Sequence, residues 1–353
     1  MNTISTNKGY SIKPQIYHSI DDLRAYAAIG IILMHVIANI STKPTDNYIT
    51  TILIPFFTDF TLLFMIVSGF SLCCGYYQKF KEGSITPNTF YKKRYLRILP
   101  FFALLCILNL ILEPSIDNLY QVYSNLTLCF SLLPNHNIEI IGVGWFLGVV
   151  FLFYLLYPFF VFMIDNKKRA WFSFIITLVF VFIIMDASFV FGGFARNNII
   201  YDMPFFLSGG IIYLYKDNIE RILKKHSFLV SIIVTIITLL YILFLNLINH
   251  GIWHYITELV IFSIWLIYAV GISNCWFLNN KITKYISKIS MEIYLAHMVI
   301  YRIIEKFHLE NYIHQNDVLY IITSLLTIGG VICFAHVIKF HIINRFEKHI
   351  RFE

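Results

Sequence analysis

Residues 227–248 read SFLVSIIVTIITLLYILFLNLI, a run of 22 residues without a charged side chain. A helix needs about 20 mostly apolar residues to cross the hydrocarbon core of a bilayer. The remainder of the 353-residue chain is similar in character, since 58% of the chain is hydrophobic and only 13% is charged. Soluble domains carry roughly 25% charged residues, so a soluble globule is excluded, as are a disordered chain and a fibre. The sequence therefore predicts an all-α fold, a polytopic membrane helix bundle.

Nine further apolar segments suggest about ten spanning helices in a single membrane domain, residues 1–353. The ten expected spans are 22–40, 52–75, 95–112, 142–164, 170–191, 199–215, 227–248, 253–275, 289–304 and 318–342. Several are short or interrupted, which is typical of broken or tilted helices around an internal cavity. Segment 118–133 is half polar, so we expect it to be interfacial or re-entrant within an extracytoplasmic loop at 113–141.

The basic residues favour one orientation of this bundle. With ten spans and both termini cytoplasmic, 23 of the 27 Lys and Arg residues face the cytoplasm, a strong positive-inside pattern. Residues 1–20 are polar and form a cytoplasmic segment, and no small-residue cleavage site follows the first apolar run, which should be a retained signal anchor. We read the six cysteines as small apolar residues and expect no disulfide framework. The four basic residues left on the other side are Lys43, Arg196, Arg302 and Lys306.

Two ionisable residues share one face of the first predicted helix. Arg24 and His35 are eleven residues apart, which is about 20° around an α-helix and about 16 Å along it. One interpretation is structural, with Arg24 as an interfacial anchor and His35 as a packing residue. The other is functional, because ionisable groups inside a membrane often mark sites. In it, Arg24 grips an anionic carrier and His35 acts as a base deeper in the membrane.

The chain resembles the acyltransferase-3 family of integral membrane acyltransferases. Asp21-x-x-Arg24-x10-His35 is similar to the first-helix signature of that family, and further stretches follow in the same order. One departure is Gly148-Val149-Val150, where many members place an acidic residue, so a role for such an acid is in doubt here. The further stretches are Phe64-Met-Ile-Val-Ser68-Gly69-Phe70, the basic segment Phe90 to Pro100, Gly144-Trp145-Phe146-Leu147 with Tyr154 and Pro158, Phe205-x3-Gly209, and Ser290-x3-Tyr294-Leu295-x-His297.

The resemblance implies a membrane O-acyltransferase in the cell inner (plasma) membrane. Such enzymes move an acyl group, usually acetyl, from cytoplasmic acyl-CoA to a hydroxyl of a cell-envelope or exported glycan. On this expectation acyl-CoA is a co-substrate, no cofactor is bound permanently, and His35 is the base, either by direct transfer or through an acyl-imidazole. Basic residues expected to hold the CoA phosphates, which also serve as ordinary positive-inside anchors, are Arg24, Lys92, Lys93, Arg94 and Arg97.

Other polar and aromatic residues are weaker candidates for the site. Ser68 and Tyr294 are considered as oxyanion donors, Glu258 as a residue that orients His35 or the acceptor, and His297 as a supporting group. Trp145 and Tyr154 suit an acceptor cleft, although an interface belt explains them equally well. We expect no metal site and no nucleic-acid partner.

Three functions remain open at this level. The preferred partner is a capsular, O-antigen or exopolysaccharide acceptor, with membrane lipid around the protein and possible association with polysaccharide assembly machinery. The alternative is a polysaccharide or lipid-linked glycan exporter or flippase component without acyl-transfer chemistry, which ten spans and an aromatic interior suit equally well. A third option is a different acyl group, or an amine or peptidoglycan acceptor.

Overall fold

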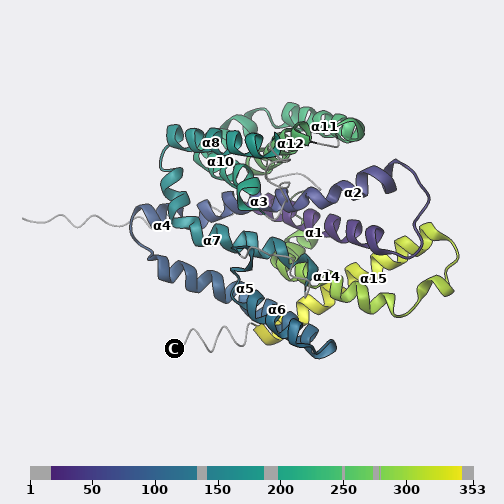
Figure 1. The fold of residues 1–353 in the computed structure, drawn as a ribbon. Helices are drawn as coiled ribbons and strands as arrows, with labels where there is room; N and C mark the ends of the chain where they lie inside the picture. The colour runs from purple at the N-terminus through teal and green to yellow at the C-terminus, as the bar shows by residue number, and fades with distance from the viewer. Residues whose placement is uncertain are drawn as a thin grey trace, which may run out of the picture.

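The architecture is a bundle of helices, shown in Figure 1 from a computed structural model. The structure describes residues 17–132, 141–186, 198–248, 251–272, 278 and 280–343, and every element within these ranges is helical. The expectations for residues 1–16, Arg196, Cys275 and part of the 113–141 loop lie outside them. The α-helices are α1 (His18–Asn39), α2 (Ile54–Phe56), α3 (Phe60–Leu72), α4 (Gln78–Lys81), α5 (Pro87–Leu112), α6 (Ile116–Leu126), α7 (Trp145–Met163), α8 (Lys167–Asp186), α10 (Ile199–Lys225), α11 (Ser227–Phe244), α12 (Gly251–Gly271), α13 (Lys281–Lys288), α14 (Ser290–Glu305) and α15 (Asn316–Val337).

Seven helical stretches within the described ranges are long and apolar enough to cross a membrane. These stretches and the apolar segments of the sequence indicate a multi-pass membrane protein. The expected count of ten is therefore supported only in part, because α1, α10 and α14 are not among the seven. The seven stretches are Ile49–Lys81, Pro87–Ile111, Gly142–Met163, Lys167–Met185, Ser227–Leu247, Gly251–Gly271 and Asn316–His341.

The three remaining long helices differ in composition and burial. α1 and α10 carry several charged residues, and α14 has only 16 residues. α1 lies among α3, α12, α13, α14 and α15, and half of its 22 residues are buried. By contrast, α6 has 11 residues and exposes Ile116, Tyr120 and Tyr123. It is too short to span a bilayer.

Helices α3 and α10 cross with their backbones in close approach. Gly69 on α3 faces Gly209 on α10, and no side chain separates the two backbones. A Cβ added to Gly69 would overlap the carbonyl oxygen of Phe206, and one added to Gly209 would overlap the carbonyl oxygen of Ile66. Small residues permit such close approach in membrane bundles, where van der Waals packing drives helix association. Two sequence motifs that lie far apart in the chain thus form one contact.

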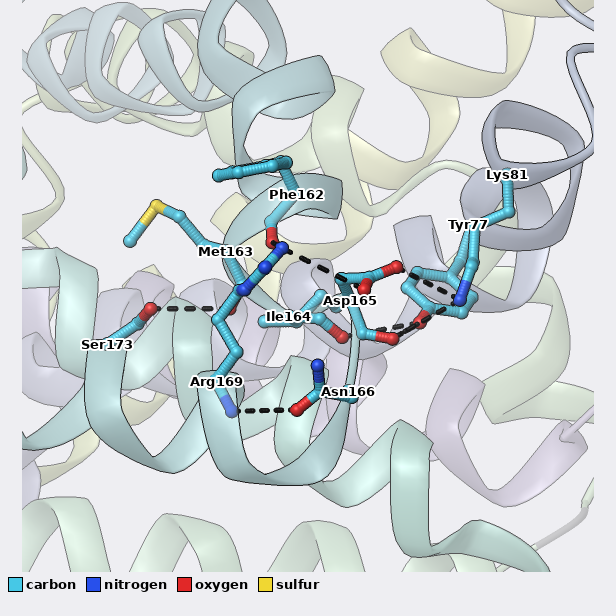
Figure 2. A network of polar contacts seen from close by, with 9 residues as sticks. All are labelled: Tyr77, Lys81, Phe162, Met163, Ile164, Asp165, Asn166, Arg169 and Ser173. Atoms are coloured by element: carbon cyan, nitrogen blue, oxygen red, sulfur yellow. Dashed lines mark hydrogen bonds and ion pairs between the residues drawn. The ribbon is translucent and has the colours of Figure 1, made fainter.

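Polar contacts tie the helix ends together on the side of the bundle where Arg24 lies. Figure 2 shows the turn between α7 and α8, where Asp165 Oδ1 is 3.0 Å from Lys81 Nζ and the Tyr77 hydroxyl donates to the Asp165 carbonyl oxygen over 2.9 Å. The hydrogen bond from Lys81 lowers the pKa of Asp165, which lies outside the spans. Similar contacts join Lys339 to Glu292 at 2.7 Å. Basic residues from two separate loops, Lys81 and Lys339, are therefore paired with acidic residues at this end.

The opposite end is held by a different set of contacts. The backbone N–H of Thr45 donates to Asp317 Oδ1 over 2.7 Å, which joins the segment after α1 to the start of α15. Lys43 Nζ donates to the carbonyl oxygens of Ile37 and Ala38, at 2.7 and 2.8 Å, in the last turn of α1. A cation placed there satisfies carbonyls that the helix leaves free.

The five cysteines within the described ranges are free thiols.

Candidate functional site

Arg24 lies in the second turn of α1, at the same end of the bundle as the paired loop lysines. Its Nη1 donates to Asp21 Oδ1 over 3.0 Å, and its Nη2 donates to Ser71 Oγ over 2.6 Å. Asp21 also accepts a hydrogen bond from Ser287 Oγ at 3.2 Å, so α13 joins the same group. The guanidinium is thus held by partners on two helices, α1 and α3, and α13 supports one of these partners. A planar guanidinium has five N–H donors, and its fork geometry suits recognition of an oxyanion.

A second guanidinium lies within a set of aromatic rings and shares Tyr154 with the first, since Tyr154 interacts electrostatically with Arg24. Arg94 of α5 lies over the rings of Tyr76, Tyr154 and Phe90, with its Cζ 4.5, 5.4 and 5.6 Å from the three ring centroids. Rings stabilise a cation over their faces when it is shielded from water. Tyr154, which the sequence linked to an acceptor cleft, therefore packs against the guanidinium of Arg94.

The other basic candidates on α5 lie differently. Arg97 is exposed and near enough to Arg24 for their charges to interact. Lys92 and Lys93 are exposed and lie on the outward side of the helix start. We call Arg24, Arg94 and Arg97 the guanidinium cluster. Its three like charges would attract a polyanion such as a diphosphate.

His35 lies at the other end of α1, only four residues before Asn39 ends the helix. Its ring is half-buried, and its centroid is 4.9 Å from that of His297 on α14, with the two rings tilted by 43°. The sequence placed both histidines in spans but could not show that they meet. The structure brings them together because α1 and α14 pack side by side.

The protonation of His297 follows from its hydrogen bond. Its Nδ1 is 2.6 Å from the carbonyl oxygen of Tyr294, three residues earlier on the same helix. A carbonyl can only accept, so Nδ1 carries the proton and Nε2 keeps a lone pair. That Nε2 is buried and has no hydrogen-bond partner among the described residues. A buried acceptor without a donor is costly, and the adjacent His35 ring is the side chain that can supply an N–H.

Of the aromatic and hydroxyl candidates, Tyr294 lies next to this pair, with its ring centroid 5.9 Å from that of His297. The Tyr294 hydroxyl donates to the Val143 carbonyl oxygen over 2.9 Å, so its proton is already used and it is a poor oxyanion donor. Trp145 begins α7 and packs edge-on against Phe146, whose ring centroid is 5.4 Å from that of Tyr294. Ser68 lies half-buried on α3, one turn before the Ser71 that binds Arg24. Ser71 was not singled out from the sequence, and its spacing of three from Ser68 is the only local signal for it.

A pocket opens at the same end of α1 as His35. It has a volume of about 400 Å³ and is lined by Met34 and Ala38 of α1, and by Lys43, Asp46 and Thr58 among others. Met34 is the immediate neighbour of His35. Its wall is mostly apolar, and the charged groups in it are Lys43 and Asp46.

Glu258 contacts a third histidine, His254 of the same helix. It is fully buried, and its Oε1 is 3.3 Å from His254 Nε2 one turn earlier on α12. His254 is in turn 3.3 Å from Asp59 Oδ2. The three side chains could together hold a metal ion. The sequence signal for them is the spacing of four between His254 and Glu258 on one helix face, whereas Asp59 lies far away along the chain.

Comparison with known proteins identifies the family of the chain. The model of the acyltransferase-3 family, described as an acyltransferase domain, matches residues 17–338. A curated relative, "Protein 2 in picA locus" of Rhizobium radiobacter, is 29% identical over 129 residues. That match spans 34% of this chain and 62% of the relative. No solved structure matches the chain.

Proposed function

The chain belongs to the acyltransferase-3 family, and from that premise we propose that it moves an acetyl group from cytoplasmic acetyl-CoA to a hydroxyl of a cell-envelope or exported polysaccharide. The observation that carries the proposal is the arrangement along α1, with a guanidinium cluster at one end and a histidine pair at the other. The end with the basic loops is assigned to the cytoplasm because basic loops stay on that side. The acceptor then enters from the opposite side.

The guanidinium cluster is assigned to the donor. CoA carries its phosphates at one end of the molecule and its thioester at the other, joined by a thin arm. Arg24, Arg94 and Arg97 would bind the phosphates through charge-assisted hydrogen bonds. The separation of about 16 Å along α1 between Arg24 and His35 is then covered by the arm, which delivers the thioester to the histidine pair.

His35 is assigned as the general base of the transfer. It accepts the proton of the acceptor hydroxyl while the hydroxyl oxygen attacks the thioester carbonyl carbon. The C–S bond then breaks, the acetyl ester forms, and the proton passes to the thiolate to give free CoA. A route through acetyl-His35 balances equally and differs only in having two transfers.

His297 is assigned as a positioning residue for His35. Its Nε2 lone pair can accept an N–H from His35, which leaves the other ring nitrogen of His35 as the base. When His35 takes up a proton, the same lone pair stabilises the imidazolium, as a carboxylate does in hydrolase triads. Burial strengthens that interaction because water does not compete for it.

The test is acetyl transfer in membranes that contain the full-length protein. Labelled acetyl-CoA is supplied, and label is counted in the surface polysaccharide for the wild type, for His35→Ala and for the control His308→Ala, which alters an exposed loop histidine. We expect the wild type and the control to transfer label, and His35→Ala to lose at least about 10²-fold in rate. Normal labelling by His35→Ala would overturn the catalytic assignment. The exporter would instead be favoured if the wild type transferred no label and His35→Ala stopped export of the glycan.

A further inference from the structure

A second group of ionisable side chains lies at the starts of α3 and α12. His254 and Glu258 are four residues apart and therefore on one face of α12. Asp59 ends the short 3₁₀ turn Phe57–Asp59, directly before α3, and meets them from the other side. We call these three side chains the α3–α12 cluster. The proposed acyl transfer makes no use of it.

The distances in the cluster are those of a ligand shell. His254 Nε2 is 3.3 Å from Asp59 Oδ2 and 3.3 Å from Glu258 Oε1, and the three atoms lie within 4.8 Å of one another. Charge-assisted N–H···O hydrogen bonds are shorter, about 2.7–2.9 Å. A tetrahedral ion with bonds of about 2.0–2.2 Å separates its ligands by about 3.3–3.6 Å. The separations around Nε2 match the second case.

We infer that Asp59, His254 and Glu258 form a binding site for a divalent transition-metal ion, with Zn²⁺ as the best fit to one imidazole and two carboxylates. Nitrogen and oxygen ligands of this kind suit Zn²⁺, whereas Mg²⁺ and Ca²⁺ prefer oxygen alone. The side chains of Asp59 and Glu258 are 4% and 0% exposed, and that of His254 is 12% exposed. One neutral imidazole and two carboxylates carry two negative charges, which a divalent ion neutralises.

An independent observation concerns Tyr241 on α11. This residue is only 6% exposed, and its hydroxyl has no hydrogen-bond partner among the residues that the structure describes. It lies close enough to Glu258 and Asp59 to interact with them electrostatically. Three protein ligands leave the fourth position of a tetrahedral ion to water. A water held there would give the buried hydroxyl a partner and complete the coordination of the ion.

The consequence of such an ion is mechanical. It would join the start of α3 to the start of α12, two helices that also contact α1. Asp59 and Glu258 each have further polar contacts within the fold, so the cluster is part of the core and not a loose surface group. The ion is therefore expected to affect the stability of the bundle, and its presence can be measured without any acyl donor.

The test uses the full-length protein purified in detergent with an affinity tag that contains no histidine. One portion is dialysed against EDTA, another is loaded with ZnCl2 and desalted, and both are analysed for metal by mass spectrometry and for thermal unfolding. The variants are His254→Gln and Glu258→Gln, which keep the size of the side chains. The control is His308→Ala, which removes an exposed histidine 3.0 Å from Glu310.

We expect about one zinc per loaded wild-type chain, with an unfolding temperature higher than that of the EDTA-treated portion. The control should behave like the wild type, and both Gln variants should hold less than a tenth of an equivalent and show no response to zinc. A loaded wild type that holds no zinc would overturn the proposal, as would Gln variants that bind zinc as the wild type does. If the Gln variants fail to fold, the zinc content and the EDTA response of the wild type decide alone. Zinc binding by a wild type that transfers no acetyl would leave this proposal standing and overturn only the proposed function.

Discussion

Helices α1 and α11 are of similar length, yet they lie in different surroundings. α11 has 18 residues, and Tyr241 is the only one that is buried. α1 has 22 residues, of which 11 are buried, including Ser19 and Asp22. α11 qualifies as a span by length and composition, and α1 does not. Hydropathy therefore finds α11, which is exposed along most of its length, but not α1 and α14, which carry the two histidines of the candidate site.

The physical reason is that an interior helix does not need a uniformly apolar surface. Asp22 of α1 accepts a hydrogen bond from Thr283 of α13, and Arg24 has Asp21 and Ser71 as partners. A polar group is tolerated inside a bundle when neighbouring helices satisfy it. The lipid around α11 offers no such partners. The following predictions test whether sensitivity to substitution follows this division.

The largest effect after loss of His35 is expected from its neighbour on α14. His297→Ala should lower kcat by about 10²-fold, because the tautomer and the imidazolium of His35 lose their support. His297→Gln, which offers an amide oxygen as acceptor, should recover part of the rate. The measurement is the pH profile of acetyl transfer. If His297→Ala changed stability but left kcat and the profile unaltered, His297 would be a packing residue only.

The α3–α10 crossing should show the largest effect on stability. Gly209→Ala places a methyl group against the backbone of α3 and should lower the unfolding free energy by about 3 kcal/mol or more, above the usual cost of overpacking. Gly329→Ala on α15 is the control, since nothing lies within 4 Å of its added Cβ. It should be neutral or slightly stabilising. Equal thermal stability of the two variants would contradict the close approach.

An intermediate effect is expected at the guanidinium cluster. Arg24→Lys keeps the charge but cannot reach both Asp21 and Ser71 as a planar fork does. We expect KM for acetyl-CoA to rise about tenfold, the size of one charge-assisted contact, with kcat changed less. Lys92→Ala, which removes an exposed charge from α5, is the matched comparison and should change KM by less than Arg24→Lys. Similar KM values for the two variants would remove Arg24 from the donor site.

A smaller, pH-dependent effect is expected outside the membrane, at the turn shown in Figure 2. Lys81 lowers the pKa of Asp165 below its ordinary 3.8. The pair therefore stabilises the fold above pH 3.8, and the contribution is lost as the pH falls through the lowered pKa. Thermal unfolding of the wild type and of Asp165→Asn, followed from pH 6 to pH 3, should converge at the acid end. Parallel curves over the whole range would show that the pair has no such role.

The smallest effect is expected on the lipid-facing side of α11. Ile236 is 50% exposed in the bundle, so Ile236→Ala should change the unfolding free energy by no more than about 0.5 kcal/mol. Thermal unfolding in detergent measures this. If the unfolding free energy fell by several kcal/mol, α11 would be covered by protein. Its surroundings would then not differ from those of α1.

Much of the fold could be predicted from the sequence, since the apolar runs of α5, α7, α8, α11, α12 and α15 mark their own positions. The pairing of helices could not, because apolar periodicity does not say which faces meet. Gly69 and Gly209 illustrate this: each is an ordinary glycine until α3 and α10 are placed together.

The candidate site was predictable to a similar degree. The shared face of Arg24 and His35 follows from helix geometry alone, and so does the pairing of His254 with Glu258. The contacts between His35 and His297, and between Asp59 and His254, join helices that are distant in sequence. Such contacts depend on tertiary packing. The sequence offered an acceptor cleft or an interface belt for Tyr154, and only the structure shows that Arg94 lies over its ring.

The unbroken first helix has a consequence for the choice of donor. Arg24 and His35 lie on a single α-helix with no proline between them, and both ends are held by neighbouring helices. On the proposed function, α1 therefore fixes the distance between the phosphate-binding residue Arg24 and the base His35 at about 16 Å. A donor is selected by the length between its phosphates and its thioester, before the size of its acyl group matters. One residue inserted between Arg24 and His35 would turn His35 by about 100° around the helix. The donor would still bind at Arg24, but His35 would no longer face its thioester.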